Sequence, residues 1–140
     1  MSEPAAGFEP HYRKSPVTDA WEPLYSRQAP GQVELGTVLK QAHCNSRGLV
    51  HGGVVAALAD NAMGLALGAV RRDAVEHPAP TGLLTVSLTI DYAASAKPGQ
   101  WLQVTPRVLK AGRSMGFVDA VITADGDIIA RASATFRILE

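Results

Sequence analysis

An apolar run from Val54 to Val70 constrains the fold of this chain more than any other segment. It consists of Ala, Val, Leu, Met and Gly, interrupted only by Asp60 and Asn61, so it is too long for an ordinary strand and rich in strong helix formers. At about 1.5 Å per residue, a helix over this run would span roughly 26 Å. Because no polar stripe follows the helical period, we expect it to be covered on most sides, with Gly64 and Gly68 allowing a neighbouring backbone to approach closely.

The start of this helix combines features that suit an active site. Asp60 on an apolar helix would lose hydration, which disfavours its charged form unless hydrogen bonds compensate. Gly52 and Gly53 leave their backbone N–H groups unobstructed at the helix end whose positive dipole can meet an oxyanion. The alternative is structural: the glycines turn the chain, and Asp60 caps or pairs at an interface. His51 also has two readings, as a base that titrates near neutral pH or as a residue that orients the loop.

Length, charge and cysteine content limit the classes of protein to consider. The chain has 140 residues, enough for one domain, and its 13 basic residues balance 13 acidic ones, so no overall field attracts nucleic acid or an anionic membrane. A single Cys44 excludes an intrachain disulfide, and the first residues lack the pattern of a secretory signal. Asp60 inside the apolar run argues against a membrane span. We therefore expect a small-molecule partner and a cytoplasmic location.

The remaining segments show the two-residue period of strands. From Leu84 to Tyr92 apolar and polar residues alternate, which predicts a strand whose apolar members, Leu84 and Val86 included, face the core. From Ile128 to Ile138 the even-numbered side chains are expected to share one face. Further strands are predicted at 24–29, 33–42, 101–109 and 116–124, with a proline-broken loop through 77–80.

These elements predict an α+β fold with a long central helix wrapped by an antiparallel sheet of five to six strands. The strand from Ile128 would extend to roughly 36 Å, long enough to run past the whole helix. Its small side chains Ala130, Ala132 and Ala134 let sheet and helix approach closely. We expect residues 21–140 to form this single domain and residues 1–20 to form a flexible or draped amino-terminal arm.

The segment HCNSRGLVHGG, followed by VVAALAD, resembles the signature of the hotdog-fold acyl-CoA thioesterases of the phenylacetate-degradation (PaaI-like) type. The later segments TVSLTIDY, AKPGQ and LKAGRS agree in order, so the resemblance covers roughly residues 24–140. It implies hydrolysis of an acyl-CoA thioester to free acid and coenzyme A, with no cofactor beyond the substrate itself. It also implies a homodimer as the active unit, which we expect to pair into a homotetramer.

The resemblance implies a role for each candidate site residue. Asp60 would act as general base on water or as nucleophile, and the N–H of Gly52 from the other subunit would polarise the thioester oxygen. Asn45 would hold the water or the thioester, and Thr85 would hydrogen-bond the water or Asp60. The residues expected to contact the acyl-CoA are Gly53, Met63, Lys110, Arg113 and Ser114.

The chemistry of thioesters agrees with these roles. Sulfur donates little resonance to the carbonyl and the thiolate leaves readily, so a carboxylate and an oxyanion site suffice without a metal or a triad. The histidines at positions 11, 43, 51 and 77 show no ligand spacing, and no metal site is expected. Two other functions stay open: a non-catalytic module that binds acyl-CoA or an aromatic ligand, and a hydratase or dehydratase, whose Asp and His arrangement is not found here.

Overall fold

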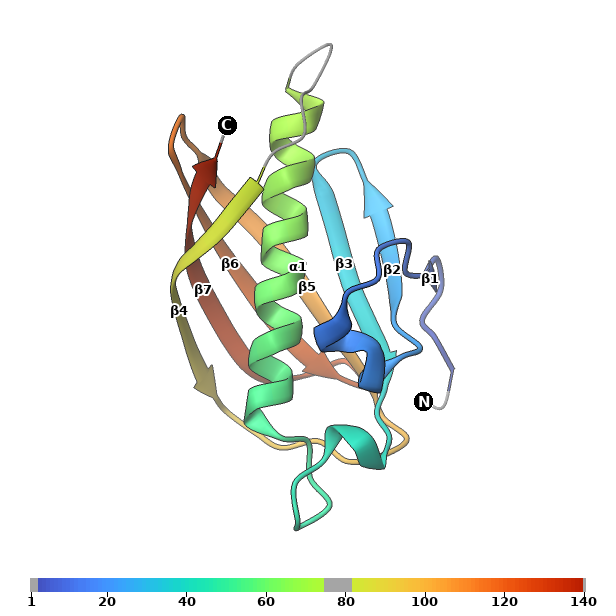
Figure 1. Ribbon diagram of the computed structural model, residues 1–140. Helices are drawn as coiled ribbons and strands as arrows, with labels where there is room; N and C mark the ends of the chain where they lie inside the picture. The colour runs from blue at the N-terminus through green and yellow to red at the C-terminus, as the bar shows by residue number, and fades with distance from the viewer. Residues whose placement is uncertain (1–2, 75–81, 140) are drawn as a thin grey trace.

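The computed structural model describes residues 3–74 and 82–139, and in it one long helix packs against an antiparallel sheet (Figure 1). The helix α1 (Gly52–Asp73) follows the short helices η1 (Pro16–Trp21) and η2 (Gln41–His43). The strands are β1 (Glu9–Pro10), β2 (Tyr25–Ala29), β3 (Gln32–Val38), β4 (Gly82–Tyr92), β5 (Trp101–Ala111), β6 (Met115–Ala124) and β7 (Asp127–Leu139). Their order in the sheet is β1-β2-β3-β5-β6-β7-β4, and each neighbouring pair is antiparallel.

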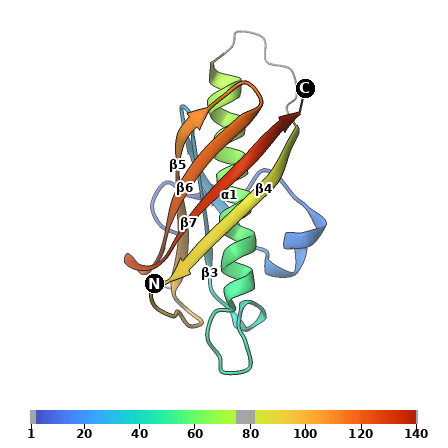
Figure 2. The same ribbon diagram turned by 90° about the vertical axis from the view of Figure 1, so that its left-hand side faces the viewer.

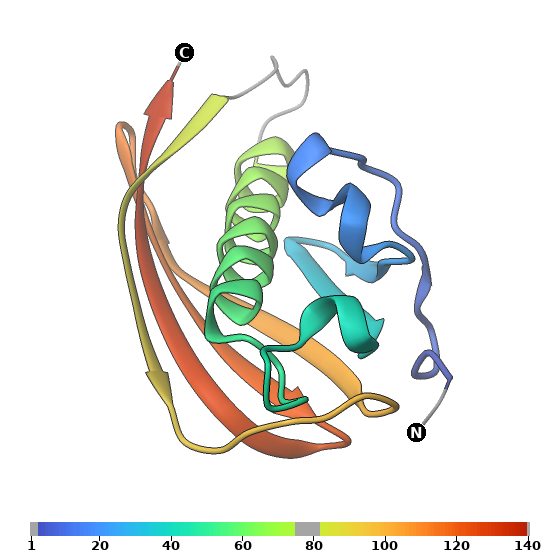
Figure 3. The ribbon, with the colours of Figure 1, turned by 60° about the horizontal axis from the view of Figure 1, so that its bottom comes forward.

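The sheet curves around one side of α1 and leaves its other face outward. Figure 3 shows this curvature, with η1 and the amino-terminal segment on the opposite side of the helix, and Figure 2 looks onto the outer face of β4 to β7. The predicted α+β class with one central helix is confirmed. The predicted count of five to six strands is wrong, because the described residues form seven. The seventh is β1, whose two residues are too few for a period to reveal.

The amino-terminal segment lies over the domain's own sheet. β1 pairs with β2, and the N–H of His11 donates to the carbonyl of Leu24 at 2.9 Å. The ring of Phe8 packs edge-on against the buried ring of Trp101, with centroids 5.0 Å apart. The predicted strand over 33–42 ends early, because the chain leaves the sheet after Val38 and turns into η2. The predicted loop through 77–80 lies outside the described residues.

The helix begins at Gly52, two residues before the apolar run, and ends with Arg71 and Arg72 in its last turn, where positive charge suits the helix dipole. By length and composition it could cross a membrane, but half of its most apolar window is buried in the domain, as in a core helix. The side chains it buries against the sheet are Val54, Val55, Leu58, Ala59, Ala62, Met63, Ala66, Leu67 and Ala69.

One stripe of α1 is not fully covered, contrary to the expectation of cover on most sides. Asp60, Gly64 and Gly68 follow each other at four-residue intervals along this stripe, and all are partly exposed. A Cβ atom at Gly68 would meet nothing within 4 Å, and one at Gly64 would meet only the ring of Phe136, at 3.6 Å, among the described residues. The expected close backbone approach at these glycines therefore does not come from this single chain.

A bulge in β4 overturns the predicted alternation of this strand. The register against β7 shifts between Thr85 and Ser87, so β4 holds one extra residue, Val86, between the pairs Thr85–Phe136 and Ser87–Thr135. Leu84 and Val86 consequently point away from the core and are 53% and 56% exposed. Thr85, which strict alternation would turn outward, lies opposite the buried Phe136 on the face that looks at α1.

β7 keeps its predicted face over most of its length. Ala130, Ala132, Ala134, Phe136 and Ile138 are all buried, as the alternation predicts. Ile128 is the exception, 61% exposed while Ile129 is buried. The register against β6 shifts between Ile122 and Thr123, which breaks the period at this end of the strand.

Candidate active site

Asp60 is held by one hydrogen bond from the sheet. The hydroxyl of Thr85 donates to Oδ1 of Asp60 at 2.7 Å, and the carboxylate is partly exposed on the uncovered stripe of α1. Its second oxygen accepts no hydrogen bond from the residues that the structure describes. The arrangement leaves a carboxylate that is fixed on one side and open on the other, which is what a general base or nucleophile requires.

The start of α1 offers one open backbone donor rather than two. The N–H of Gly53 donates to Nδ1 of His51 at 2.8 Å, so this amide is already paired within the chain, and the expected contact of Gly53 with the substrate stays a prediction. The N–H of Gly52 makes no hydrogen bond within the described part of the chain. Because Nδ1 of His51 accepts, its neutral ring carries the proton on Nε2, as a donor at an exposed position.

Gly52 and Asp60 are not brought together within one chain. They lie eight residues apart on the same helix, about 12 Å along its axis, too far for one to attack and the other to polarise the same carbonyl. A site that uses both groups needs the second group from another copy of the chain.

Asn45 folds its own loop in this structure. Its Oδ1 accepts from the N–H of Arg47 at 2.9 Å and of Leu49 at 3.3 Å, and its backbone N–H donates to the carbonyl of Leu49. The loop is joined to the helix start through His51, whose N–H donates to the carbonyl of His43 at 2.8 Å. Only the side-chain NH₂ of Asn45 is left to hold a water or thioester, and the residue lies at the Gly52 end of the helix.

The residues expected to contact the acyl-CoA fall into two groups. Lys110, Arg113 and Ser114 are exposed around the turn between β5 and β6, at the far end of α1, where Arg71 donates to the carbonyl of Gly112 at 3.0 Å. Met63 is fully buried in the core cluster of the single chain, and its expected contact with the acyl-CoA stays a prediction.

His43, one of the four histidines considered above for a metal site, has a structural role in this chain. Its buried ring accepts from the N–H of Lys40 through Nδ1 at 2.9 Å, so Nε2 carries the proton and faces the carbonyl of Trp21 at 3.3 Å. Burial lowers the pKa of His43. With both nitrogens in use the ring is not free to bind a metal, and no group of three or more His, Cys, Asp or Glu side chains in the described residues could hold one.

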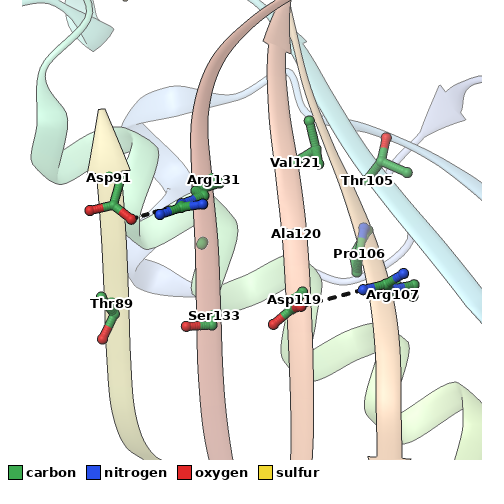
Figure 4. Close-up of a pocket in the computed structure, with 11 residues that line it drawn as sticks. Thr89, Asp91, Thr105, Pro106, Arg107, Asp119, Ala120, Val121, Arg131 and Ser133 are labelled. Carbon is green, nitrogen blue, oxygen red and sulfur yellow. Dashed lines mark hydrogen bonds and ion pairs between the residues drawn. The ribbon is translucent and has the colours of Figure 1, made fainter. Parts of the chain in front are cut away.

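A separate groove lies on the outer face of the sheet, opposite the helix (Figure 4). It has a volume of about 610 Å³ and is crossed by two ion pairs, Arg131 with Asp91 at 2.9 Å and Arg107 with Asp119 at 3.6 Å. The candidate catalytic residues do not line it. Because the charged side chains of the groove are exposed and already paired, the uncovered stripe of α1, with its open carboxylate oxygen, is the better candidate for chemistry.

A long helix cradled by an antiparallel sheet, with a carboxylate fixed from the sheet, defines the hotdog thioesterase class. The sequence pattern of the Thioesterase superfamily matches residues 47–130. A Pseudomonas aeruginosa protein named "Putative esterase PA0474" is 36% identical over 133 residues, 94% of this chain and 95% of the relative. Human acyl-coenzyme A thioesterase 13 is 35% identical over 109 residues, 76% of this chain and 73% of the relative. The chain belongs to the Thioesterase superfamily.

Solved structures agree with this membership. Zebrafish thioesterase superfamily member 2 matches with a TM-score of 0.76 and 28% identity, over 88% of this chain and 87% of that one. Two others are similar in fold. A mutant of the phenylacetic acid degradation protein PaaI from Thermus thermophilus has a TM-score of 0.76 and 21% identity, over 89% of this chain and 100% of that one. A Streptococcus pneumoniae hypothetical thioesterase protein with coenzyme A has a TM-score of 0.73 and 22% identity, over 84% of this chain and 90% of that one. The predicted resemblance to PaaI-like hotdog thioesterases is confirmed, and membership supports thioester hydrolysis.

Proposed function

We propose that the protein hydrolyses acyl-CoA thioesters, with Asp60 as the general base or nucleophile. The observation that carries the proposal is the hydrogen bond from Thr85, which fixes one carboxylate oxygen while the other stays open on the uncovered stripe of α1. The acyl-CoA substrate is supported by the relative named acyl-coenzyme A thioesterase 13 and by the coenzyme A in the streptococcal structure. No added cofactor is needed for this chemistry.

The proposed reaction balances with these groups alone. Asp60 takes a proton from water as the water oxygen attacks the thioester carbon, and the oxyanion that forms is stabilised by the N–H of Gly52. The tetrahedral intermediate then collapses, the carbon–sulfur bond breaks, and the thiolate of coenzyme A leaves with the proton. If Asp60 is instead the nucleophile, its carboxylate attacks the thioester carbon, the carbon–sulfur bond breaks, and the thiolate of coenzyme A leaves as an acyl anhydride forms. Water then hydrolyses the anhydride to the free acid and the Asp60 carboxylate, and supplies the proton for the thiol. Lys110 and Arg113 are proposed to attract the phosphates of coenzyme A.

The active unit is proposed to be a homodimer in which Gly52 of one protomer faces Asp60 of the other. Gly52 and Asp60 lie about 12 Å apart along the helix, at about 1.5 Å per residue, which favours a site shared between protomers. Two further features support the homodimer. The glycines of the uncovered stripe leave room for a partner, and β4, the last strand of the sheet, exposes Leu84 and Val86. Pairing of two dimers into a homotetramer and a cytoplasmic location complete the proposal.

The catalytic role is tested by assaying wild type, Asp60→Asn and Asp73→Asn against a panel of acyl-CoAs with a reagent that detects free thiol. Asp73 is a matched control, since it is a carboxylate on the same helix that accepts from the N–H of Gly31 at 2.7 Å. We expect Asp60→Asn to lose at least about 100-fold in kcat and Asp73→Asn to keep wild-type activity. Undiminished hydrolysis in Asp60→Asn refutes the assignment. Saturable acyl-CoA binding by wild type without thiol release would instead identify a binding module.

Mixing two inactive variants tests the shared site. Gly52→Pro deletes the N–H at the first helical position, where the helix backbone tolerates proline, and His51 before it already has the extended backbone that precedes proline (φ −72°, ψ 131°). The new Cβ atom would lie 3.2 Å from the ring of Tyr92, so this ring must shift slightly in the variant. A heterodimer of Asp60→Asn and Gly52→Pro chains retains one intact site. After unfolding and refolding together, the mixture should regain about a quarter of wild-type activity, as random pairing in a twofold dimer requires. No recovery would exclude a site shared between protomers.

A further inference from the structure

Tyr92 at the end of β4 contacts the first residue of α1. Its hydroxyl donates to the carbonyl oxygen of Gly52 at 2.5 Å. A Cβ atom at position 52 would lie 3.2 Å from the phenol carbon and oxygen, tighter than ordinary contact, so glycine is what lets the ring approach this closely. The contact joins residues 40 positions apart in the chain and fixes the helix start against the sheet.

The acceptor of this hydrogen bond belongs to a chain of polar groups. The carbonyl of Gly52 shares its peptide unit with the N–H of Gly53, and that N–H donates to Nδ1 of His51. Hydrogen bonds at the two ends of one peptide polarise and orient each other. The Tyr92 hydroxyl therefore orients the peptide that caps α1 and, through it, the ring of His51, whose Nε2 then points outward as a donor.

The same strand also fixes the carboxylate. Thr85 and Tyr92 both lie on β4, with the bulge after Thr85 between them, and they hydrogen-bond Asp60 and Gly52 respectively. Each of the two residues to which chemistry is assigned is thus contacted by a side chain of β4, Asp60 at its carboxylate and Gly52 at its carbonyl. Burial raises the pKa of the Tyr92 phenol, which keeps it a donor throughout the neutral range.

We propose that Tyr92 is a positioning residue for the oxyanion site: through the carbonyl of Gly52 it holds residue 52, which carries the proposed amide donor on its preceding peptide, and it orients the His51 ring through the N–H of Gly53. The proposal rests on the function proposed above for the Gly52 amide. It assigns Tyr92 no contact with substrate and no proton transfer.

The test compares Tyr92→Phe with Tyr12→Phe. The two tyrosines are a matched pair, since each is 51% exposed and each variant loses a single oxygen, but Tyr12 lies in the amino-terminal segment. For Tyr92→Phe we expect kcat with an acyl-CoA that wild type hydrolyses to fall about tenfold while KM stays within about twofold, because one hydrogen bond that holds the residue carrying the donor is lost. Its Gly53 amide proton should shift in the NMR spectrum. Tyr12→Phe should match wild type in each measurement.

The possible failures are distinguishable. If wild type releases no thiol from any acyl-CoA, the proposed function fails, and the role of Tyr92 fails with it. If wild type is active and Tyr92→Phe retains kcat within about twofold, only the role of Tyr92 is overturned. A raised KM at unchanged kcat also overturns the role of Tyr92, because substrate binding would then explain the loss. A loss of activity together with dissociation to monomers, measured by light scattering, overturns it as well, because assembly would then explain the loss.

Discussion

Removal of the Thr85 hydroxyl tests how much the sheet contributes to the candidate base. Thr85→Val keeps the shape of the side chain and deletes the donor that lies 2.7 Å from Oδ1 of Asp60. A hydrogen bond to a charged group contributes about 1.5–3 kcal/mol, and because Asp60 is partly exposed, water can replace part of it. We take the lower end, about 1.5 kcal/mol, which corresponds to roughly a tenfold fall in kcat if the bond orients the carboxylate in the transition state.

The assay is thiol release at saturating acyl-CoA, with two companion variants. Thr85→Ser retains a hydroxyl and should recover most of the activity. Thr89→Val makes the same change on the same strand, but Thr89 lines the groove on the outer face, so its activity should equal that of wild type. If Thr85→Val retains kcat within about twofold, or if Thr85→Ser is as impaired as Thr85→Val, the hydroxyl does not orient the base and the reasoning is wrong.

Two further predictions concern stability. Gly116→Ala should destabilise the fold by about 1–3 kcal/mol in denaturant unfolding, because its Cβ would lie 2.4 Å from Cδ2 of the fully buried Leu67. In a Leu67→Ala background the same change should cost little. Equal losses of stability in both backgrounds would contradict the clash. Burial lowers the pKa of both His11 and His43 below the ordinary 6.5. Below pH 6.5 the unfolded chain therefore binds protons that the folded chain does not, and stability falls as the pH drops below 6.5. The double variant His11→Leu, His43→Gln should show a smaller dependence of the unfolding free energy on pH just below 6.5, and an unchanged dependence would rule out the histidines. The lowered pKa of Asp125 does not interfere, because it acts below the ordinary value of 3.8.

The period of hydrophobic residues predicted most of the fold. The run from Val54 indicated α1 to within a few residues, and alternation indicated six of the seven strands. These elements are set by short-range patterns, which a single sequence displays. The two-residue strand β1 displays none, because its place in the sheet depends on pairing with β2 and on Phe8 covering Trp101.

The candidate site was only partly predictable for the same reason. Asp60, Gly52 and His51 stand out locally, whereas the contact of Tyr92 with Gly52 joins distant parts of the chain. A signal was present, since Tyr92 ends the alternating strand that carries Thr85, but alternation alone does not say which helix residue it meets. Alternation even placed Thr85 outward, and only the family resemblance gave it a partner.

The sequence by itself determined that a long helix, with one carboxylate in its apolar run, lies against a sheet, because helix and strand periods are present in neighbouring residues. The tertiary structure decided which side chains the sheet presents to that helix. A bulge in β4 turns Thr85 towards Asp60, the His51 ring takes the amide of Gly53 and leaves that of Gly52 open, and the stripe of α1 that carries Asp60 stays partly exposed. Strand register and hydrogen-bond choice depend on partners far along the chain, and no local pattern encodes them.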